Sequence, residues 1–225
     1  MGNIRGKSLV YGVGINDVAA PTQWRENGKL VDCPIYKCWH GMLRRGYDSK
    51  WQKRFPSYCG VTVHPDWHRF SNFKDWLSQQ PQANWQELCL DKDLLIKGNK
   101  VYAPDTCCFL THIENTVFRP HTSTRLGCTS AEYKRKKPWR AYPTSRTRRR
   151  NNQSTYYYST KEEAEFIAMR ESMPIVIEIA NVNPHQFIRD AMFRWIADWQ
   201  GELERLQETL KTASGGGALF EIQGV

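Results

Sequence analysis

The sequence predicts an α+β fold made of small sheets and helices, and three observations carry this prediction. Residues 90–118 read as strand, turn, strand and short helix. Residues 127–164 read as two or three strands that run into a helix. Residues 185–210 repeat apolar side chains at spacings of three and four, as in an amphipathic helix. We therefore expect a small β-β-α core, then a small three-stranded sheet plus helix, and then a C-terminal amphipathic helix.

The first third of the chain is predicted to supply packing. Apolar residues recur at helical spacing between residues 35 and 47, and a second amphipathic stripe lies between residues 70 and 77. Val61 and Val63 alternate as a short strand, and we expect the aromatic residues of both stripes to form a core. Residues 11–14 contain a lone Gly-x-Gly with no helix-opening glycine after it, so no phosphate-binding loop is indicated.

The stretch from Leu90 to Asn115 is the most informative part of the chain. We expect a strand at Leu90, a turn at 97–100 and a second strand at 101–102, which together make a hairpin with a broad loop. The helix that follows begins near residue 111. This order places Asp91 and Asn115 where one folded loop brings both to a single metal ion. A hard cation held by two oxygen ligands, with waters to spare, is suited to cutting phosphodiesters.

This stretch resembles the ββα-metal finger of HNH (His-Me finger) endonucleases, especially the phage homing type. Asp91 matches the metal-binding Asp of that family, and Asn115 matches the second ligand in the closing helix of the finger. The spacing of aromatic residues and cysteines between residues 33 and 76 is also similar to the usual preface of the phage HNH core. The resemblance implies a Mg²⁺ (or Mn²⁺) cofactor. Two positions depart from the family, since Lys92 stands where the general-base His belongs and Thr106 where a loop-bracing Asn belongs.

The catalytic candidates are Lys92 and His112, and three interpretations stay open. An unperturbed lysine, with a pKa of about 10.4, cannot accept a proton from water at neutral pH. Burial beside a divalent cation could lower the pKa of Lys92, or its charge could stabilise the transition state. His112 could take the role of the base instead. The third interpretation is a site that binds DNA without cutting it.

Positive charge is concentrated in residues 132–150. This segment has nine Lys or Arg residues and one acid, so it carries +8 of the total net charge of +9. Tyr133, Trp139 and Tyr142 are spaced through it. Aromatic residues among basic ones are more typical of a structured surface that contacts phosphates and bases than of a solvated tail. The partner that this predicts is double-stranded DNA.

The same region, together with the helix that begins after Thr160, resembles the plant ethylene-response-factor (Apetala-type, integrase-like) DNA-binding domain. Thr160 and Glu163 make a capping box at the helix start. The resemblance implies a three-stranded sheet whose side chains enter the major groove. The second turn of this sheet, at residues 146–151, is expected to be a basic arm that contacts the DNA backbone or enters the minor groove. In the first third of the chain, Arg44 and Arg45 are expected to extend toward DNA from the end of the first helix. The expected DNA contacts are Arg135, Lys136, Lys137, Trp139, Arg140, Arg146, Arg148, Arg149 and Arg150.

The C-terminal helix is expected to cover the small sheet, with an irregularity at Gly201. A homodimer through this helix is the alternative to a monomer. We expect an HNH-like nuclease domain with a helical preface at 1–120, a basic sheet-plus-helix module at 121–175, C-terminal helices at 176–213 and a flexible tail at 214–225.

Composition bounds the class of protein. No apolar run reaches the roughly 20 residues of a membrane span, and the start lacks a secretory signal, so no membrane partner and a cytoplasmic location are expected, in an infected bacterial host if a phage encodes the chain. Seven cysteines without Cys-x-x-Cys spacing predict free thiols. The pairs Cys33 with Cys38 and Cys59 with His64 are weak zinc candidates, because the second pair is split across a strand.

The sequence therefore favours a phage homing-type HNH DNA endonuclease. A catalytically weak or inactive HNH-derived DNA-binding regulator or accessory protein is the alternative. An RNA or single-strand binder that uses the aromatic and basic segment ranks third, because no ribonucleoprotein-type motif is present.

Overall fold

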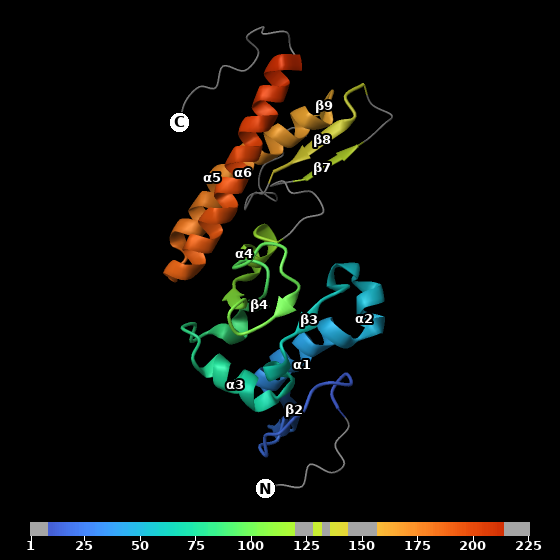
Figure 1. The fold of residues 1–225 in the computed structure, drawn as a ribbon, viewed down its shortest axis with the longest axis vertical. Helices are drawn as coiled ribbons and strands as arrows, with labels where there is room; N and C mark the ends of the chain where they lie inside the picture. The colour runs from blue at the N-terminus through green and yellow to red at the C-terminus, as the bar shows by residue number, and fades with distance from the viewer. Residues whose placement is uncertain (1–8, 120–127, 132–135, 144–156, 214–225) are drawn as a thin grey trace. The chain divides into compact units, whose positions relative to one another are not determined.

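Helices and short strands alternate along the whole chain in a computed structural model, which describes residues 9–119, 128–131, 136–143 and 157–213 (Figure 1). The described residues form six α-helices and four small sheets, so the predicted α+β class is confirmed. The chain divides into two compact units, Met1–Asn115 and Thr116–Val225.

The first unit begins with strands and continues with helices that surround an aromatic core. Its elements are β1 (Gln23–Glu26), β2 (Lys29–Asp32), α1 (Pro34–Tyr47), α2 (Ser49–Arg54), β3 (Thr62–Val63), α3 (Phe70–Ser78), β4 (Cys89–Asp91), β5 (Val101–Tyr102), β6 (Cys108–Leu110) and α4 (His112–Val117), which ends in the second unit, with 3₁₀ turns at Pro56–Tyr58, Pro65–His68 and Trp85–Glu87. The predicted helices and the strand at residues 61–63 are thus present.

The core of the first unit lies between α1, α3 and the short strands. Trp39 and Leu43 of α1 and Phe73 of α3 are fully buried, as their helical spacing predicts. The indole of Trp39 donates a hydrogen bond of 2.7 Å to the carbonyl of Trp67, so the largest core side chain has its polar atom satisfied. The expectation that these aromatic residues pack rather than react is confirmed.

The Gly-x-Gly at residues 12–14 has a packing explanation. Gly12 has φ +79°, a left-handed conformation that favours glycine. Gly14 is buried against α1, and a Cβ built on it would lie 2.4 Å from Cδ1 of Leu43 and 2.9 Å from the ring of Trp39. The second glycine therefore lets the N-terminal segment approach α1 closely.

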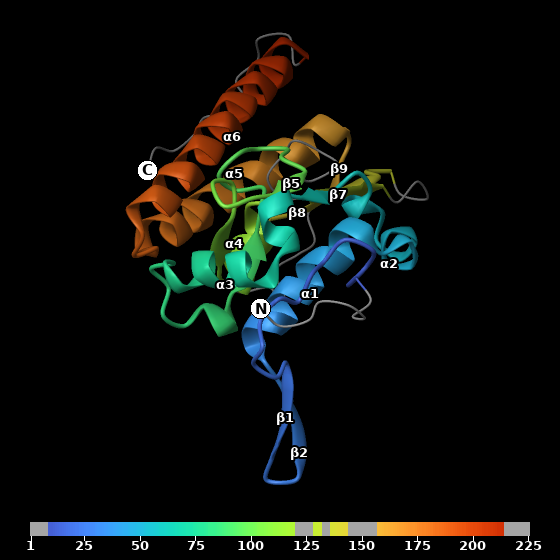
Figure 2. The ribbon, with the colours of Figure 1, turned by 60° about the horizontal axis from the view of Figure 1, so that its bottom comes forward.

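An antiparallel hairpin, β1 with β2, extends away from the rest of the first unit (Figure 2). Asn27 and Gly28 both have positive φ, at +49° and +76°, as a two-residue type I′ turn requires. This hairpin was not predicted, although Asn-Gly between two short strand-like segments is its usual signal in a sequence. Trp24 and Leu30 remain 40% and 61% exposed.

The hairpin predicted at residues 90–102 pairs differently from the expectation. β5 (Val101–Tyr102) pairs in parallel with β3. The antiparallel partner of β4 is β6, with Asp91 opposite Cys108. The turn at 97–100 exists, with Gly98 at φ +78°, but the chain continues through a longer loop before it returns beside β4. A two-residue strand carries too little alternation to specify its partner, since only Tyr102 of β5 is buried and Val101 is exposed.

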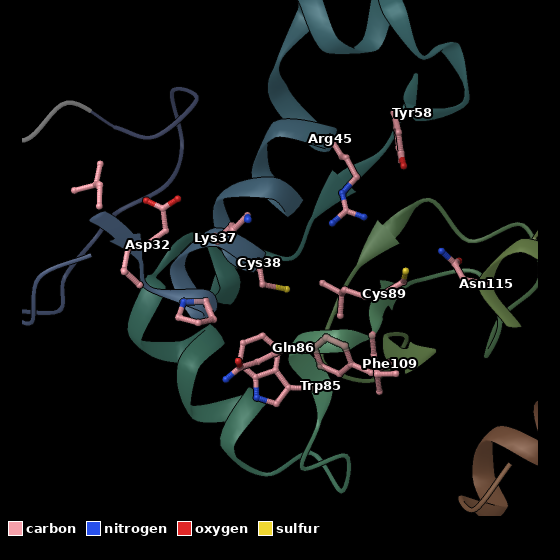
Figure 3. Close-up of a pocket in the computed structure, with 15 residues that line it drawn as sticks. Asp32, Lys37, Cys38, Arg45, Tyr58, Trp85, Gln86, Cys89, Phe109 and Asn115 are labelled. Atoms are coloured by element: carbon pink, nitrogen blue, oxygen red, sulfur yellow. The ribbon is translucent and has the colours of Figure 1, made fainter. Parts of the chain in front are cut away.

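Arg44 and Arg45 lie at the end of α1, and neither simply extends into solvent. The guanidinium of Arg44 stacks 3.7 Å from the ring centroid of Trp51 and pairs with Asp48 at 3.7 Å. Arg45 turns toward the core side of α1, where its guanidinium points into a pocket (Figure 3). The sequence gives the helical position of both residues but not this inward rotamer.

The second unit combines a three-stranded antiparallel sheet with two long helices. Its elements are β7 (Cys128–Ala131), β8 (Trp139–Tyr142), β9 (Tyr157–Tyr158), α5 (Lys161–Val182) and α6 (Gln186–Ala213), with the strands in the order β7-β8-β9. Helix α5 packs against all three strands and against α6. The sheet followed by a helix was predicted, as was the C-terminal helix, but it is α5 that packs against the strands, whereas α6, expected to cover the sheet, packs mainly against α5.

Several details of the second unit were predicted or mispredicted from the sequence. Thr160 caps α5 by accepting from Glu163 N at 3.1 Å, while the Glu163 carboxylate accepts from Thr160 N at 3.1 Å, so the capping box is confirmed. The helix α6 continues through Gly201, where an irregularity was expected. The expected boundary at 175/176 falls inside α5, since Pro174 does not end this helix. No helix among the described residues is long and apolar enough to cross a membrane.

Candidate functional site

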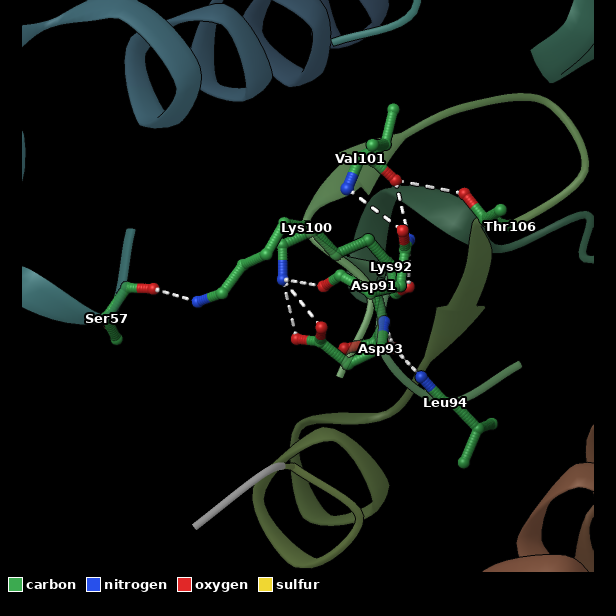
Figure 4. Close-up of polar contacts among 9 residues, drawn as sticks. Ser57, Asp91, Lys92, Asp93, Leu94, Lys100, Val101 and Thr106 are labelled. Atoms are coloured by element: carbon green, nitrogen blue, oxygen red, sulfur yellow. Dashed lines mark hydrogen bonds and ion pairs between the residues drawn. The ribbon is translucent and has the colours of Figure 1, made fainter. Parts of the chain in front are cut away.

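The predicted metal ligand Asp91 is the last residue of β4 and is only 6% exposed. Its Oδ1 accepts hydrogen bonds from the backbone N–H groups of Asp93 at 2.8 Å and Leu94 at 2.7 Å, which turn the chain sharply after the strand (Figure 4). Among the described residues, none donates a hydrogen bond to Oδ2 of Asp91. One oxygen of this carboxylate thus shapes the loop.

The electrostatic surroundings of Asp91 oppose its charge. Burial raises the pKa of Asp91, and the nearby Asp93 carboxylate raises it further. The backbone hydrogen bonds and the ammonium of Lys92 lower it, but the net direction is upward. A buried carboxylate whose ionised form is disfavoured is the kind of group that a divalent cation stabilises.

Lys92 is also buried, at 5% exposed, and its ammonium is fully engaged. Nζ donates to both carboxylate oxygens of Asp93, at 2.7 and 2.8 Å, and to the carbonyl of Asn99 at 3.2 Å. These three acceptors match the three N–H donors of a protonated lysine. This geometry assigns Lys92 the role of bracing the loop that follows β4.

Two further side chains hold the loop that follows β4. The amide of Asn99 donates to the carbonyls of Lys92 at 2.8 Å and Val101 at 2.7 Å, and its oxygen accepts from Val101 N at 3.0 Å. The hydroxyl of Thr106 donates to the Val101 carbonyl at 3.0 Å. Thr106 also donates toward the Ala103 carbonyl at 3.4 Å, so its short side chain ties the loop to β5. The sequence analysis missed the role of Asn99, although an Asn in a Gly-Asn turn is a typical backbone-bonding residue.

Helix α4 follows β6 and carries Asn115 and His112. A capping box begins it, because Glu114 accepts from Thr111 N at 2.7 Å while the Thr111 hydroxyl accepts from Glu114 N at 3.2 Å. This box fixes the helix start one residue after β6. His112 is exposed at the first position of the helix. Among the described residues, no hydrogen bond is formed by the side-chain amide of Asn115.

Asn115 lines a pocket of about 780 Å³ in the first unit. Its amide points toward Cys89, and the pocket wall continues along β4 to Leu90, the residue before Asp91 (Figure 3). On the paired strand, burial raises the pKa of Cys108, and the charges of Asp91 and of Glu114, the neighbour of Asn115, raise it further. Asn115 lines this pocket, whereas Asp91 is not among the residues that line it.

Neither predicted zinc pair belongs to a larger ligand cluster. The described residues contain no group of three or more His, Cys, Asp or Glu that could hold a metal ion. Six cysteines there are free thiols, and burial raises the pKa of Cys38 to about 11. An Asp-Asn pair is a different kind of site, since it supplies two oxygens and leaves the other positions to water and phosphate.

In the second unit, strand β8 carries two of the predicted DNA contacts. Successive side chains of a strand point to opposite faces, so Trp139 and Arg140 cannot face a duplex from the same side of the sheet. The Arg140 guanidinium lies 4.7 Å from the ring centroid of Tyr142 and 6.0 Å from that of Tyr157, which places these three on one face. Lys136 and Lys137 are exposed just before the strand. Arg135, Arg146, Arg148, Arg149 and Arg150 lie outside the described residues.

Comparison of the chain with protein-family models, with curated proteins and with solved structures yields no match. The functional interpretation therefore rests on the residues and their geometry.

Proposed function

We propose that the chain is a metal-dependent DNA endonuclease of the phage homing HNH type, in which Asp91 and Asn115 hold Mg²⁺ or Mn²⁺. The observation that carries this proposal is the state of Asp91. Asp91 is a buried carboxylate of raised pKa at the end of β4, and its Oδ2 accepts no hydrogen bond from the described residues. The side-chain amide of Asn115, on α4, likewise forms no hydrogen bond among those residues. Oxygen donors of this kind fit a hard divalent cation.

The side chains around this pair have separate roles in the proposal. Asp91 and Asn115 orient the cation, which when bound would polarise a phosphodiester and stabilise the leaving oxygen. Lys92, tied to Asp93 and Asn99, keeps the loop after β4 in shape and adds a fixed positive charge near the site. His112, exposed at the start of α4, is the candidate base that takes a proton from the attacking water.

DNA affinity is assigned to the second unit. The described part of its basic region places Lys136 and Lys137 in solvent and Arg140 on the sheet beside two tyrosines. Lysine and arginine side chains neutralise phosphates, and tyrosine rings stack on bases or sugars.

A second candidate function is a DNA-binding regulator or accessory protein that does not cut. The ion pair between Lys92 and Asp93 favours it, because Lys92 stands where the general-base His of the HNH family belongs and its ammonium is engaged 2.7 Å from the Asp93 carboxylate.

A plasmid assay separates the two functions. Supercoiled DNA is incubated with the purified chain and Mg²⁺ or Mn²⁺, alongside Asp91→Asn, Asn115→Ala, His112→Ala and the control Asp75→Asn, which changes an exposed aspartate of α3. The endonuclease predicts nicking that needs metal, is lost in the first two variants, is reduced in the third and is unchanged in the control. Binding in a gel-shift assay without nicking under either metal would establish the regulator instead.

A further inference from the structure

Arg45 is a cation that faces a pocket without a carboxylate to balance it. Its Nε donates to the carbonyl of Gly41 at 3.1 Å, its guanidinium carbon lies 5.1 Å from the ring centroid of Tyr102, and it hydrogen-bonds Tyr58. All three partners are uncharged groups. No Asp or Glu among the described residues forms an ion pair with Arg45, whereas its neighbour Arg44 pairs with Asp48.

An arginine in this position stays charged, since the guanidinium does not lose its proton in proteins. Removing a cation from water without an anionic partner costs free energy that hydrogen bonds to neutral groups offset only in part. An anion in the pocket would supply the missing partner. The planar fork of an arginine is best matched by a carboxylate or a phosphate.

The rest of the pocket indicates which anion fits. Lys37, on the same helix as Arg45, adds a second positive charge to the lining. The single acid there, Asp32, already accepts a hydrogen bond of 2.6 Å from Gln23 of the hairpin. In Figure 3 the guanidinium of Arg45 and the amide of Asn115 point into the same space, with the rings of Trp85 and Phe109 on another side of it.

We propose that this pocket is a phosphate subsite in which Arg45 binds a nucleotide phosphate. Asn115, the proposed metal ligand, lines the same pocket. This inference rests on the proposed function for the identity of the natural ligand, a DNA strand, but not for the binding of the phosphate itself. The volume of about 780 Å³ exceeds what one phosphate needs and admits a whole nucleotide unit, with its sugar or base against the aromatic side.

Thermal unfolding in the presence of EDTA tests the subsite without any metal. The full chain is titrated with inorganic phosphate, thymidine 5′-monophosphate and thymidine, with chloride at matched ionic strength as the reference. The variants are Arg45→Met, Arg45→Lys and the matched control Arg44→Met, which removes the same charge one position earlier on α1. We expect saturable stabilisation of the wild type by the two phosphate compounds but not by thymidine. The response should be lost in Arg45→Met, weakened in Arg45→Lys and kept in Arg44→Met.

A structural role for Arg45 predicts a different pattern. If the residue served only to stabilise the fold, Arg45→Met would melt well below the wild type in chloride, whereas a binding role predicts a melting temperature equal to or above it. An unchanged phosphate response in Arg45→Met, or no saturable response in the wild type, would overturn the subsite. Should Arg45→Met not fold, an undiminished response in Arg45→Lys overturns it, because that variant keeps the charge but loses the fork.

Plasmid nicking then separates the subsite from the endonuclease. We expect Arg45→Met to lower the nicking rate by about tenfold or more and Arg44→Met to change it little. A phosphate response that depends on Arg45, combined with no nicking by the wild type, would support the subsite and refute the endonuclease. Nicking that is equally fast in Arg45→Met, without a phosphate response, would do the reverse.

Discussion

Replacing Asp91 with asparagine should stabilise the metal-free protein and abolish its response to metal. The substitution keeps an oxygen acceptor at the Oδ1 position, so the hydrogen bonds from Asp93 N and Leu94 N, at 2.8 and 2.7 Å, can persist. It removes a negative charge from a residue that is 6% exposed and lies near the Asp93 carboxylate. Exchange of a buried, poorly compensated charge for a neutral group of similar shape typically stabilises a protein, and we expect about 1–2 kcal/mol at pH 7.

The pH dependence follows from the raised pKa of Asp91. Because the folded-state pKa lies above the unfolded value, its contribution to stability is fully present below the unfolded pKa and is lost as the pH rises through the folded pKa. The wild type should therefore approach Asp91→Asn in stability at acid pH and fall below it toward neutral pH. A profile in which the difference between the two proteins grows toward acid pH would contradict this assignment.

Metal should invert the order of stability. At a Mg²⁺ or Mn²⁺ concentration a hundred times its dissociation constant, binding adds about 2.7 kcal/mol to the free energy of unfolding of the wild type, which exceeds the advantage of Asp91→Asn without metal. Asp91→Asn should gain almost nothing. Asp91→Ala serves as the contrast, since it leaves the N–H groups of Asp93 and Leu94 without their acceptor and should cost about 2 kcal/mol with or without metal.

Urea unfolding followed by circular dichroism, with EDTA or with metal, measures all of these differences, and Asp75→Asn is the surface control. The reasoning fails if Asp91→Asn is less stable than the wild type in EDTA by more than about 1 kcal/mol, a value near the precision of the method. It fails equally if that variant keeps the metal response of the wild type.

Three other substitutions test the surroundings of the site by urea unfolding. Lys92→Met leaves the Asp93 carboxylate without its ammonium and should cost about 3 kcal/mol, whereas a cost below about 0.5 kcal/mol would show that the pair is not structural. Gly14→Ala forces a Cβ to 2.4 Å from Leu43 and should cost about 1–3 kcal/mol; an unaffected stability would contradict the close packing on α1. Burial raises the pKa of Asp17, but hydrogen bonds from Ser71 and Arg69 outweigh it and lower the net value, so its contribution to stability is present above the unfolded pKa and is lost as the pH falls through the folded one. Asp17→Asn should therefore flatten the stability profile below about pH 4, and an unchanged acid limb would refute this.

The sequence predicted the elements of this chain better than their pairing. Helical spacing located α1 and α3, and the capping box at Thr160 located the start of α5, because both signals are local and depend on side-chain periodicity or on a three-residue hydrogen-bond pattern. Strand partners depend on distant residues. Val101 and Tyr102 were assigned to the wrong neighbour because two residues carry too little alternation to specify a register.

Side-chain direction was the other limit of the sequence. Arg44 and Arg45 are adjacent and chemically identical, yet one stacks on Trp51 at the surface and the other turns into the pocket. The 100° rotation between successive helical residues makes such a difference expected, but which residue turns inward depends on where the strands pack. The position of Lys92 alone likewise leaves a role as base open, and only the folded loop turns the Asp93 carboxylate back onto the Lys92 ammonium.

The buried charges of the first unit differ in whether the fold compensates them, and this difference supports the functional interpretation. Lys92 and Asp93 satisfy each other, as a structural ion pair must. Asp91 and Arg45 have no such partner among the described residues, and they are too far apart to form an ion pair. Both still act on the same interior thiol, since the pKa of Cys107 is raised to about 12, mainly by burial, with the Asp91 charge contributing to the rise and the Arg45 charge opposing it. In the proposed function a cation would bind at Asp91 and a DNA phosphate at Arg45, so that one substrate complex would supply a counterion to each.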